Sequence, residues 1–97
     1  MLHLIFQSSI DSALLQRIDS GDDVVFFENA CYRLLKNAVL KSELQQLLEN
    51  RVYLHVLAIE LETRGIDVEE IVSGIKVIDS SDLVELTENN KVIRTWS

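Results

Sequence analysis

The clearest pattern along the chain is an uninterrupted run of four large apolar residues at positions 24–27. Runs without polar alternation are typical of strands buried on both faces, as in parallel sheets that helices cover. The polar residues Glu28 and Asn29 end the run, and we expect Asn29 to cap a helix that begins near Ala30. The pattern therefore predicts an α/β fold, with Cys31 in the first turn of that helix.

Apolar patterns elsewhere predict that strands and helices alternate. Besides residues 23–27, strands are expected over 2–6, 52–57, 75–78 and 92–95. Apolar residues at helical spacing predict helices over 10–18, from 30 to 39, over 42–51 and 82–88, and a short helix that ends at Arg64. Five strands joined by right-handed helical crossovers would form a flavodoxin-like three-layer sandwich, a mainly parallel sheet with helices on both faces.

Residues suited to helix ends support these boundaries. The serines at positions 8 and 9 can cap the first helix, Ser42 with Gln45 matches a capping box, and Asp79 can cap the last helix. Gly65 suits the left-handed position that follows a helix. A length of 97 residues fits one domain and leaves no room for a second, so we expect a single domain over 1–97.

Charge and composition exclude several classes of protein. With 16 acidic against 9 basic residues, the surface should repel phosphate backbones, which disfavours direct binding to nucleic acid. We interpret Lys36, Lys41 and Arg51 as a solvated face. One cysteine forms no internal disulfide, the apolar start lacks the basic flank of a signal peptide, and no stretch reaches membrane-spanning length. We therefore expect a cytoplasmic protein without a membrane contact.

The common catalytic and cofactor motifs are missing. Three glycines provide no glycine-rich phosphate loop, so a nucleotide enzyme is not expected. His3 and His55 lie in predicted strands without further ligands at metal spacing, and we interpret both as structural histidines with local hydrogen bonds. The acidic pairs are interpreted as solvated surface, namely Asp22 with Asp23, Glu60 with Glu62, and Glu69 with Glu70. We expect neither a metal nor a cofactor.

Cys31 is the one candidate catalytic residue, and two interpretations of it stay open. At a helix N-terminus the dipole favours the thiolate, which would suit a nucleophile or a persulfide carrier. In contrast, Cys31 begins an apolar series with Leu34, Leu35 and Ala38, so its side chain is expected to point into the core as a small hydrophobe. The two aromatic residues Tyr53 and Trp96 could anchor an interface, or Trp96 could cover the edge of the sheet.

Several segments together resemble the TusB/DsrH family of sulfur-relay subunits. They are the opening Met-Leu-His-Leu with Ser8 and Ser9, residues 60–65, the stretch Ile-Asp-Ser-Ser-Asp-Leu-Val-Glu-Leu-Thr at 78–87, and Trp96. The resemblance extends from end to end, and its more specific parts are the opening and the stretch at 78–87. It implies a flavodoxin-like fold and assembly with paralogous TusC/DsrF-like and TusD/DsrE-like subunits into a heterohexamer.

The resemblance also implies a function for the assembled complex. A TusBCD-type complex accepts persulfide sulfur from TusA and passes it to TusE for 2-thiolation of the wobble uridine of certain tRNAs, whereas a DsrEFH-type complex passes it to a DsrC-like acceptor in oxidative sulfur metabolism. In both branches the established sulfur-carrying cysteine belongs to the TusD/DsrE-like sister subunit. The resemblance therefore favours a mainly structural subunit that meets tRNA only indirectly.

Two other hypotheses remain beside the structural subunit. The chain could itself be a sulfurtransferase that uses Cys31 as the persulfide carrier, or it could be a stand-alone flavodoxin-like binding module. Loss of sulfur transfer on substitution of Cys31 would select the first of these, and a stable monomer without paralogues would select the second.

Overall fold

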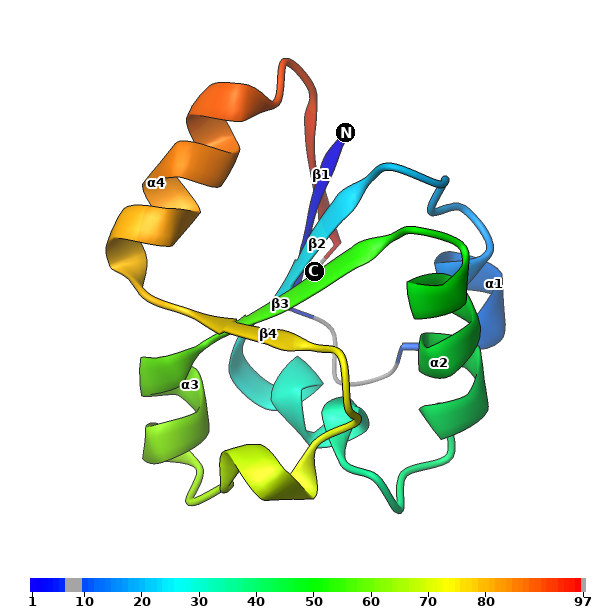
Figure 1. Cartoon of the computed structure of the whole chain (residues 1–97), viewed down its shortest axis with the longest axis vertical. Helices are drawn as coiled ribbons and strands as arrows, with labels where there is room; N and C mark the ends of the chain where they lie inside the picture. Colours follow the sequence, from blue (N-terminus) through cyan, green and yellow to red (C-terminus); the bar gives the residue numbers. More distant parts are fainter. Residues whose placement is uncertain (7–9, 97) are drawn as a thin grey trace.

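A five-stranded parallel sheet forms the centre of the computed structural model, which describes residues 1–6 and 10–96 (Figure 1). Its described strands are β1 (Leu2–Ile5), β2 (Asp23–Phe26), β3 (Tyr53–Leu57), β4 (Lys76–Ile78) and β5 (Ile93–Trp96). They lie in the order β4-β3-β2-β1-β5, and every neighbouring pair is parallel. The predicted α/β fold with a five-stranded parallel sheet is confirmed.

Helices cover the two faces of the sheet unequally. The strands from β1 to β4 are joined by α1 (Ser12–Leu15), the 3-10 helix η1 (Glu28–Leu34), α2 (Lys41–Glu49), α3 (Ala58–Thr63) and the 3-10 helix η2 (Val68–Glu70). These connections all run in one direction across the sheet, so right-handed crossovers place them on one face. Only α4 (Ser80–Asn89) runs back, from β4 to β5, and it therefore lies on the other face (Figure 1).

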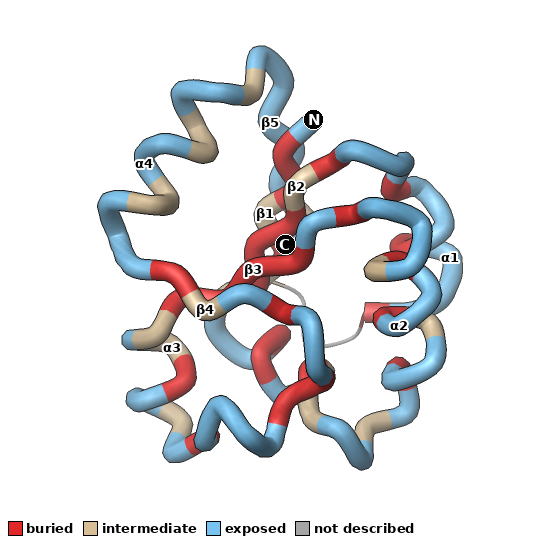
Figure 2. Tube along the Cα trace, viewed as in Figure 1, coloured by how far each residue is buried: buried red, intermediate tan, exposed pale blue. Residues whose placement is uncertain are grey.

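The hydrophobic core follows this asymmetry. The larger cluster lies between the sheet and the helices α1, η1, α2 and α3. It includes Phe26, Leu34 and Leu44. The smaller cluster, under α4, contains Leu2, Val25, Leu57 and Ile78, against which Leu83 and Leu86 of α4 are packed only in part. No residue of α4 is fully buried, and Figure 2 shows this helix in the colours of exposed and intermediate residues.

The predicted helix from Ala30 to residue 39 is wrong in type and length. The chain forms the 3-10 helix η1 over Glu28–Leu34 instead. Phe27 occupies its N-cap position, and Asn29 lies inside the helix and does not cap it. A 3-10 helix brings residues three apart onto one face, which places both Cys31 and Leu34 in the core. The helix cannot continue because Leu35 forms an antiparallel bridge with Ile71.

Of the other predicted helix ends, those at Gly65 and Asp79 are confirmed and the one at Ser42 is wrong. Gly65 has the expected positive φ of 66°, and Asp79 accepts a hydrogen bond from the backbone N–H of Asp82 at the start of α4. The capping box at Ser42 is wrong, because α2 begins after Leu40 without a side-chain cap and the Ser42 hydroxyl donates to Glu43 instead. The first helix is capped by Asp11, whereas Ser8 and Ser9 lie outside the described residues.

Candidate functional site

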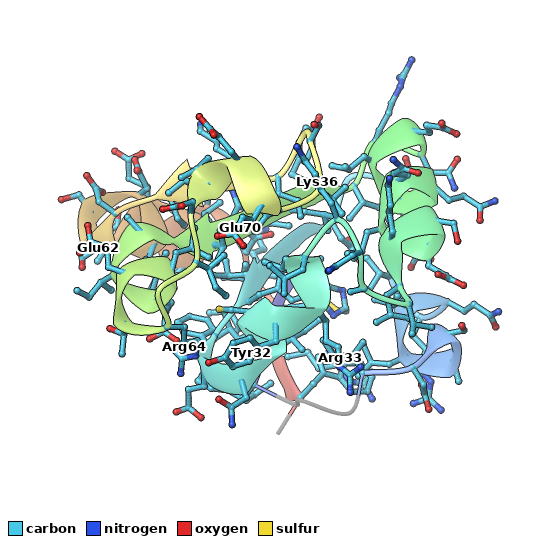
Figure 3. The ribbon with its side chains drawn as sticks, turned by 90° about the horizontal axis from the view of Figure 1, so that it is seen from below. Tyr32, Arg33, Lys36, Glu62, Arg64 and Glu70 are labelled. Carbon is cyan, nitrogen blue, oxygen red and sulfur yellow. The ribbon has the colours of Figure 1, made fainter. Side chains whose placement is uncertain are left out.

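The candidate site lies where η1 and α3 follow the carboxyl ends of β2 and β3. In open α/β sheets ligands and chemistry gather at this end of the strands. Figure 3 looks onto it from below, with Tyr32 of η1 and Arg64 at the end of α3 labelled on neighbouring elements. Cys31 comes from η1, and Glu60 from the first turn of α3. The site therefore combines the thiol of Cys31 with the ion pair of Glu60 and Arg64.

Cys31 lies inside the core at this end of the sheet. Its exposed fraction is 0%, and Sγ lies 3.8 Å from the backbone oxygen of Phe26, to which the thiol can donate a weak hydrogen bond. The side chain thus points inward, as its apolar series predicts, and Tyr32 beside it is 45% exposed. In the described conformation, the sulfur of Cys31 is not exposed to a persulfide partner.

The surroundings of Cys31 hold it in the neutral thiol form. Burial and, to a smaller extent, the negative charge of Glu60 together raise the pKa of the Cys31 thiol from its ordinary value of 9.0 to about 11, while Arg64 partly opposes both. The thiolate is the nucleophilic form of cysteine, so a raised pKa lowers its reactivity at neutral pH. Geometry and electrostatics both favour a structural thiol.

The charged pair ties α3 to the turn after β2. Nη1 of Arg64 lies 3.2 Å from Oε2 of Glu60 and also donates to the Glu60 backbone oxygen at 3.1 Å. The same carboxylate accepts a hydrogen bond from the backbone N–H of Glu28, which has a positive φ of 51°. The interpretation of Glu60 as solvated surface is therefore wrong, although the i,i+4 spacing of Glu60 and Arg64 was a signal for this pair.

His3 is a structural residue at the other end of the sheet. Its Nε2 lies 2.9 Å from Oδ2 of Asp22, and its Nδ1 accepts a hydrogen bond from Nε1 of Trp96 at 3.2 Å. Both ring nitrogens are thus satisfied. Burial alone would raise the pKa of Asp22, but hydrogen bonds from His3, the Asp19 backbone and the Met1 amino group hold that pKa below its ordinary value. Trp96 packs over His3 and joins β5 to this network.

His55 forms a second histidine–aspartate pair on the opposite face. Nε2 of His55 lies 3.1 Å from Oδ1 of Asp23, and the Asn90 side chain donates to the other oxygen of Asp23 at 3.3 Å. Asn90 follows α4, so this pair fastens the end of α4 to the sheet. Both histidines form the local hydrogen bonds predicted for them. They lie in β1 and β3 with β2 between them, and do not share a site. The interpretation of Asp22 and Asp23 as solvated surface is wrong, because each carboxylate pairs with a histidine.

The chain is similar in sequence to known proteins over nearly its whole length. A family model described as DsrH like protein matches residues 5–93. The chain belongs to the DsrH-like family. Protein TusB of Buchnera aphidicola subsp. Baizongia pistaciae (strain Bp) is 29% identical over 99 residues, which cover 99% of this chain and 100% of that protein. The resemblance to the TusB/DsrH family is confirmed, and membership supports a role as a sulfur-relay subunit.

Solved structures show the same fold at low sequence identity. A protein of unknown function from Methanobacterium thermoautotrophicum matches with a TM-score of 0.81 at 15% identity, over 97% of this chain and 95% of that one. The ychN protein from E. coli matches with a TM-score of 0.76 at 14% identity, over 98% of this chain and 97% of that one. Within the described residues, no helix combines the length and the apolar character that crossing a membrane requires.

Proposed function

We propose that this chain is a mainly structural subunit of a cytoplasmic TusBCD-type complex that passes persulfide sulfur towards 2-thiolation of the tRNA wobble uridine. Its partners in the proposal are TusC-like and TusD-like paralogues in a heterohexamer, with a TusE-like protein as acceptor. The observation that carries the proposal is the buried Cys31 in a chain of the DsrH-like family. The transferred sulfur is then carried by a thiol of another subunit.

The relay chemistry explains why burial matters. In each transfer a thiolate attacks the outer sulfur of a persulfide, a new S–S bond forms, the old one breaks, and the donor leaves as a thiolate. The carrier therefore needs an accessible sulfur that ionises readily. Cys31 has neither property, because it is buried and its pKa is raised to about 11.

The uneven covering of the sheet supports assembly with other subunits. All-parallel sheets occur almost only with both faces covered, but here one face carries α4 alone. At the uncovered edge, Ile93 of β5 is 45% exposed, and the neighbouring Val92 is 53% exposed. Obligate interfaces are rich in such apolar contacts, so we assign a subunit contact to the α4 face and the β5 edge.

A sulfur-transfer assay on the purified complex tests the proposal. Cys31→Ala in this subunit should leave the rate of persulfide transfer to the acceptor within about twofold of the wild-type rate, because no step uses that thiol. A matched Cys→Ala change in the TusD-like subunit serves as the positive control and should abolish transfer. Loss of transfer in Cys31→Ala with the complex intact would instead make this chain the sulfurtransferase.

The second candidate is a DsrH-type subunit in oxidative sulfur metabolism, which the description of the matching family model favours. Both candidates use the same chemistry and differ in the acceptor. Transfer to a TusE-like acceptor and loss of tRNA 2-thiouridine on deletion of this chain would select the first. A DsrC-like acceptor and unchanged tRNA would select the second.

A further inference from the structure

A pocket of ≈ 360 Å³ lies at the amino ends of β3 and β4, at the opposite end of the sheet from Cys31. Its apolar wall includes Leu48 and Leu54, and its polar side chains come from Arg51, Tyr53, His55 and Lys76. Small-molecule sites are commonly of this size and combine an apolar lining with a few polar groups.

The charge of this pocket is opposite to that of the protein. The chain has a formal net charge of −7, yet two cations and no carboxylate line the pocket. Within the part of the chain that the structure describes, the side chains of Arg51 and Lys76 form no ion pair. The exposed ring of Tyr53 adds a hydroxyl donor beside them. The pocket thus presents two cations and a hydroxyl, and Lys76 also lines a smaller neighbouring pocket that contains Asp82 and Glu85.

The backbone at Arg51 supplies an independent observation. Arg51 has a φ of 64° and follows α2 in a Schellman motif, in which Val52 N–H donates to Leu47 O and Arg51 N–H to Leu48 O. The same motif ends α3, where the residue with positive φ is Gly65. Glycine adopts this conformation without the steric cost that arginine incurs. A strained arginine at such a position suggests a use for its side chain.

His55 adds an unused hydrogen-bonding atom to the same wall. The residue is 7% exposed and lines the pocket, and its Nε2 is engaged by Asp23. Its Nδ1 is buried and has no partner within the described residues. Native proteins rarely leave a buried polar atom unpaired, and a bound ligand or water is one usual explanation. Because Nε2 donates to Asp23, Nδ1 is an acceptor in the neutral ring and can pair with a water or with the O–H of a protonated phosphate.

We propose that this pocket binds a small oxyanion of the phosphate or sulfate type, either free or at the end of a small organic molecule. The guanidinium of Arg51 offers two parallel N–H donors to such an oxyanion, and the ammonium of Lys76 offers a second charge. Tyr53 donates from the rim, and the apolar wall of Leu48 and Leu54 accommodates an organic body where there is one. The site lies away from Cys31 and does not depend on the proposed sulfur relay.

The test is a titration of the ¹⁵N-labelled full chain with inorganic phosphate, inorganic sulfate and phenyl phosphate, followed by amide chemical shifts. We expect saturable shifts at residues 51–55 and 74–76. Arg51→Gly and Lys76→Gln should each weaken binding about tenfold, since each removes a charge-assisted hydrogen bond. Lys91→Gln, which removes one exposed charge elsewhere, should leave the affinity unchanged.

Every outcome of this titration either supports or overturns the proposed oxyanion site. Tighter binding of phenyl phosphate than of inorganic phosphate supports an organic ligand, and equal binding supports a free anion. Absence of saturable binding by all three probes overturns the site, as does an equal loss in all three variants, which would indicate general charge attraction. Arg51→Gly should also raise the melting temperature, so weaker binding in that variant is not caused by unfolding.

Discussion

Cys31 shows how its surroundings determine what a single thiol can do. The position just after a buried strand suggested a reactive cysteine, because a helix N-terminus stabilises a thiolate. In the structure the sulfur lies in the core beside the Phe26 carbonyl, and burial raises its pKa to about 11. The sequence indicated both possibilities, and the packing of η1 supports a structural role for Cys31.

This raised pKa predicts a pH dependence of stability. Above about pH 9 the unfolded chain loses the Cys31 proton first, whereas the folded chain keeps it until about pH 11. The folded state then binds more protons, so the free energy of unfolding falls as pH rises across this window. The loss should reach roughly 2–3 kcal/mol, since each pKa unit corresponds to about 1.4 kcal/mol.

Chemical denaturation of wild type and Cys31→Ala at several pH values measures this effect. All other side chains are the same in both proteins, so their contributions cancel in the comparison. The variant should be less stable at neutral pH because it leaves a small cavity, and the gap should narrow as pH rises from about 9 to about 11. A gap that stays constant would show that the folded thiol titrates like an exposed one.

At the scale of elements, α2 and α3 end in the same hydrogen-bonding motif but carry different residues at its left-handed position. Gly65 after α3 and Arg51 after α2 both have positive φ, and a Cβ at Gly65 would meet nothing within 4 Å. A substitution at Gly65 therefore reports on backbone strain alone, whereas Arg51→Gly also removes a side chain. They form a matched pair.

We predict opposite effects on stability for this pair. Arg51→Gly should raise the free energy of unfolding by about 1 kcal/mol, and Gly65→Ala should lower it by about 1 kcal/mol. Urea denaturation of the two variants measures both changes. Destabilisation by Arg51→Gly would mean that contacts of the Arg51 side chain outweigh the strain of its backbone.

The attachment of α4 to the sheet is weaker than that of the other long helix. α2 buries Leu44 and Leu47, whereas α4 buries no residue fully and is held by partial packing of Leu83 and Leu86 and by Asn90. Helices with few buried contacts open with little free energy. In the isolated chain, amides of α4 should exchange with solvent faster than those of α2.

Hydrogen exchange of the isolated chain and of the assembled complex measures this difference. If partners cover the α4 face, the amides of α4 should slow on assembly while those of α2 change little. Equal protection of α4 in both states would place the subunit contact on another face.

The sequence predicted the elements whose signals are local and strong. The apolar run at 24–27 gave β2, and Asp79 and Gly65 marked helix ends correctly. It missed η1, because the bridge between Leu35 and Ile71 is a contact between distant segments that no local pattern shows. It likewise missed the pocket at Arg51, since its side chains come from α2, β3 and β4 and meet only in the fold.

At the scale of the whole molecule, the unequal faces of the sheet are the main feature. Three connections cover one face densely, and the fourth, a single partly packed helix, crosses the other. Such an arrangement leaves apolar side chains of α4 and β5 exposed, and our proposal places the contact with another subunit there. The central claim is therefore that this chain works as one part of a larger relay complex.

The most direct test is to purify the tagged chain from its native host, determine the mass of the assembly in solution, and identify co-purifying chains by mass spectrometry. We predict two stoichiometric paralogues of the TusC/DsrF and TusD/DsrE types, in an assembly several times heavier than the 11.1 kDa chain. A stable monomer without these paralogues would contradict the proposed role.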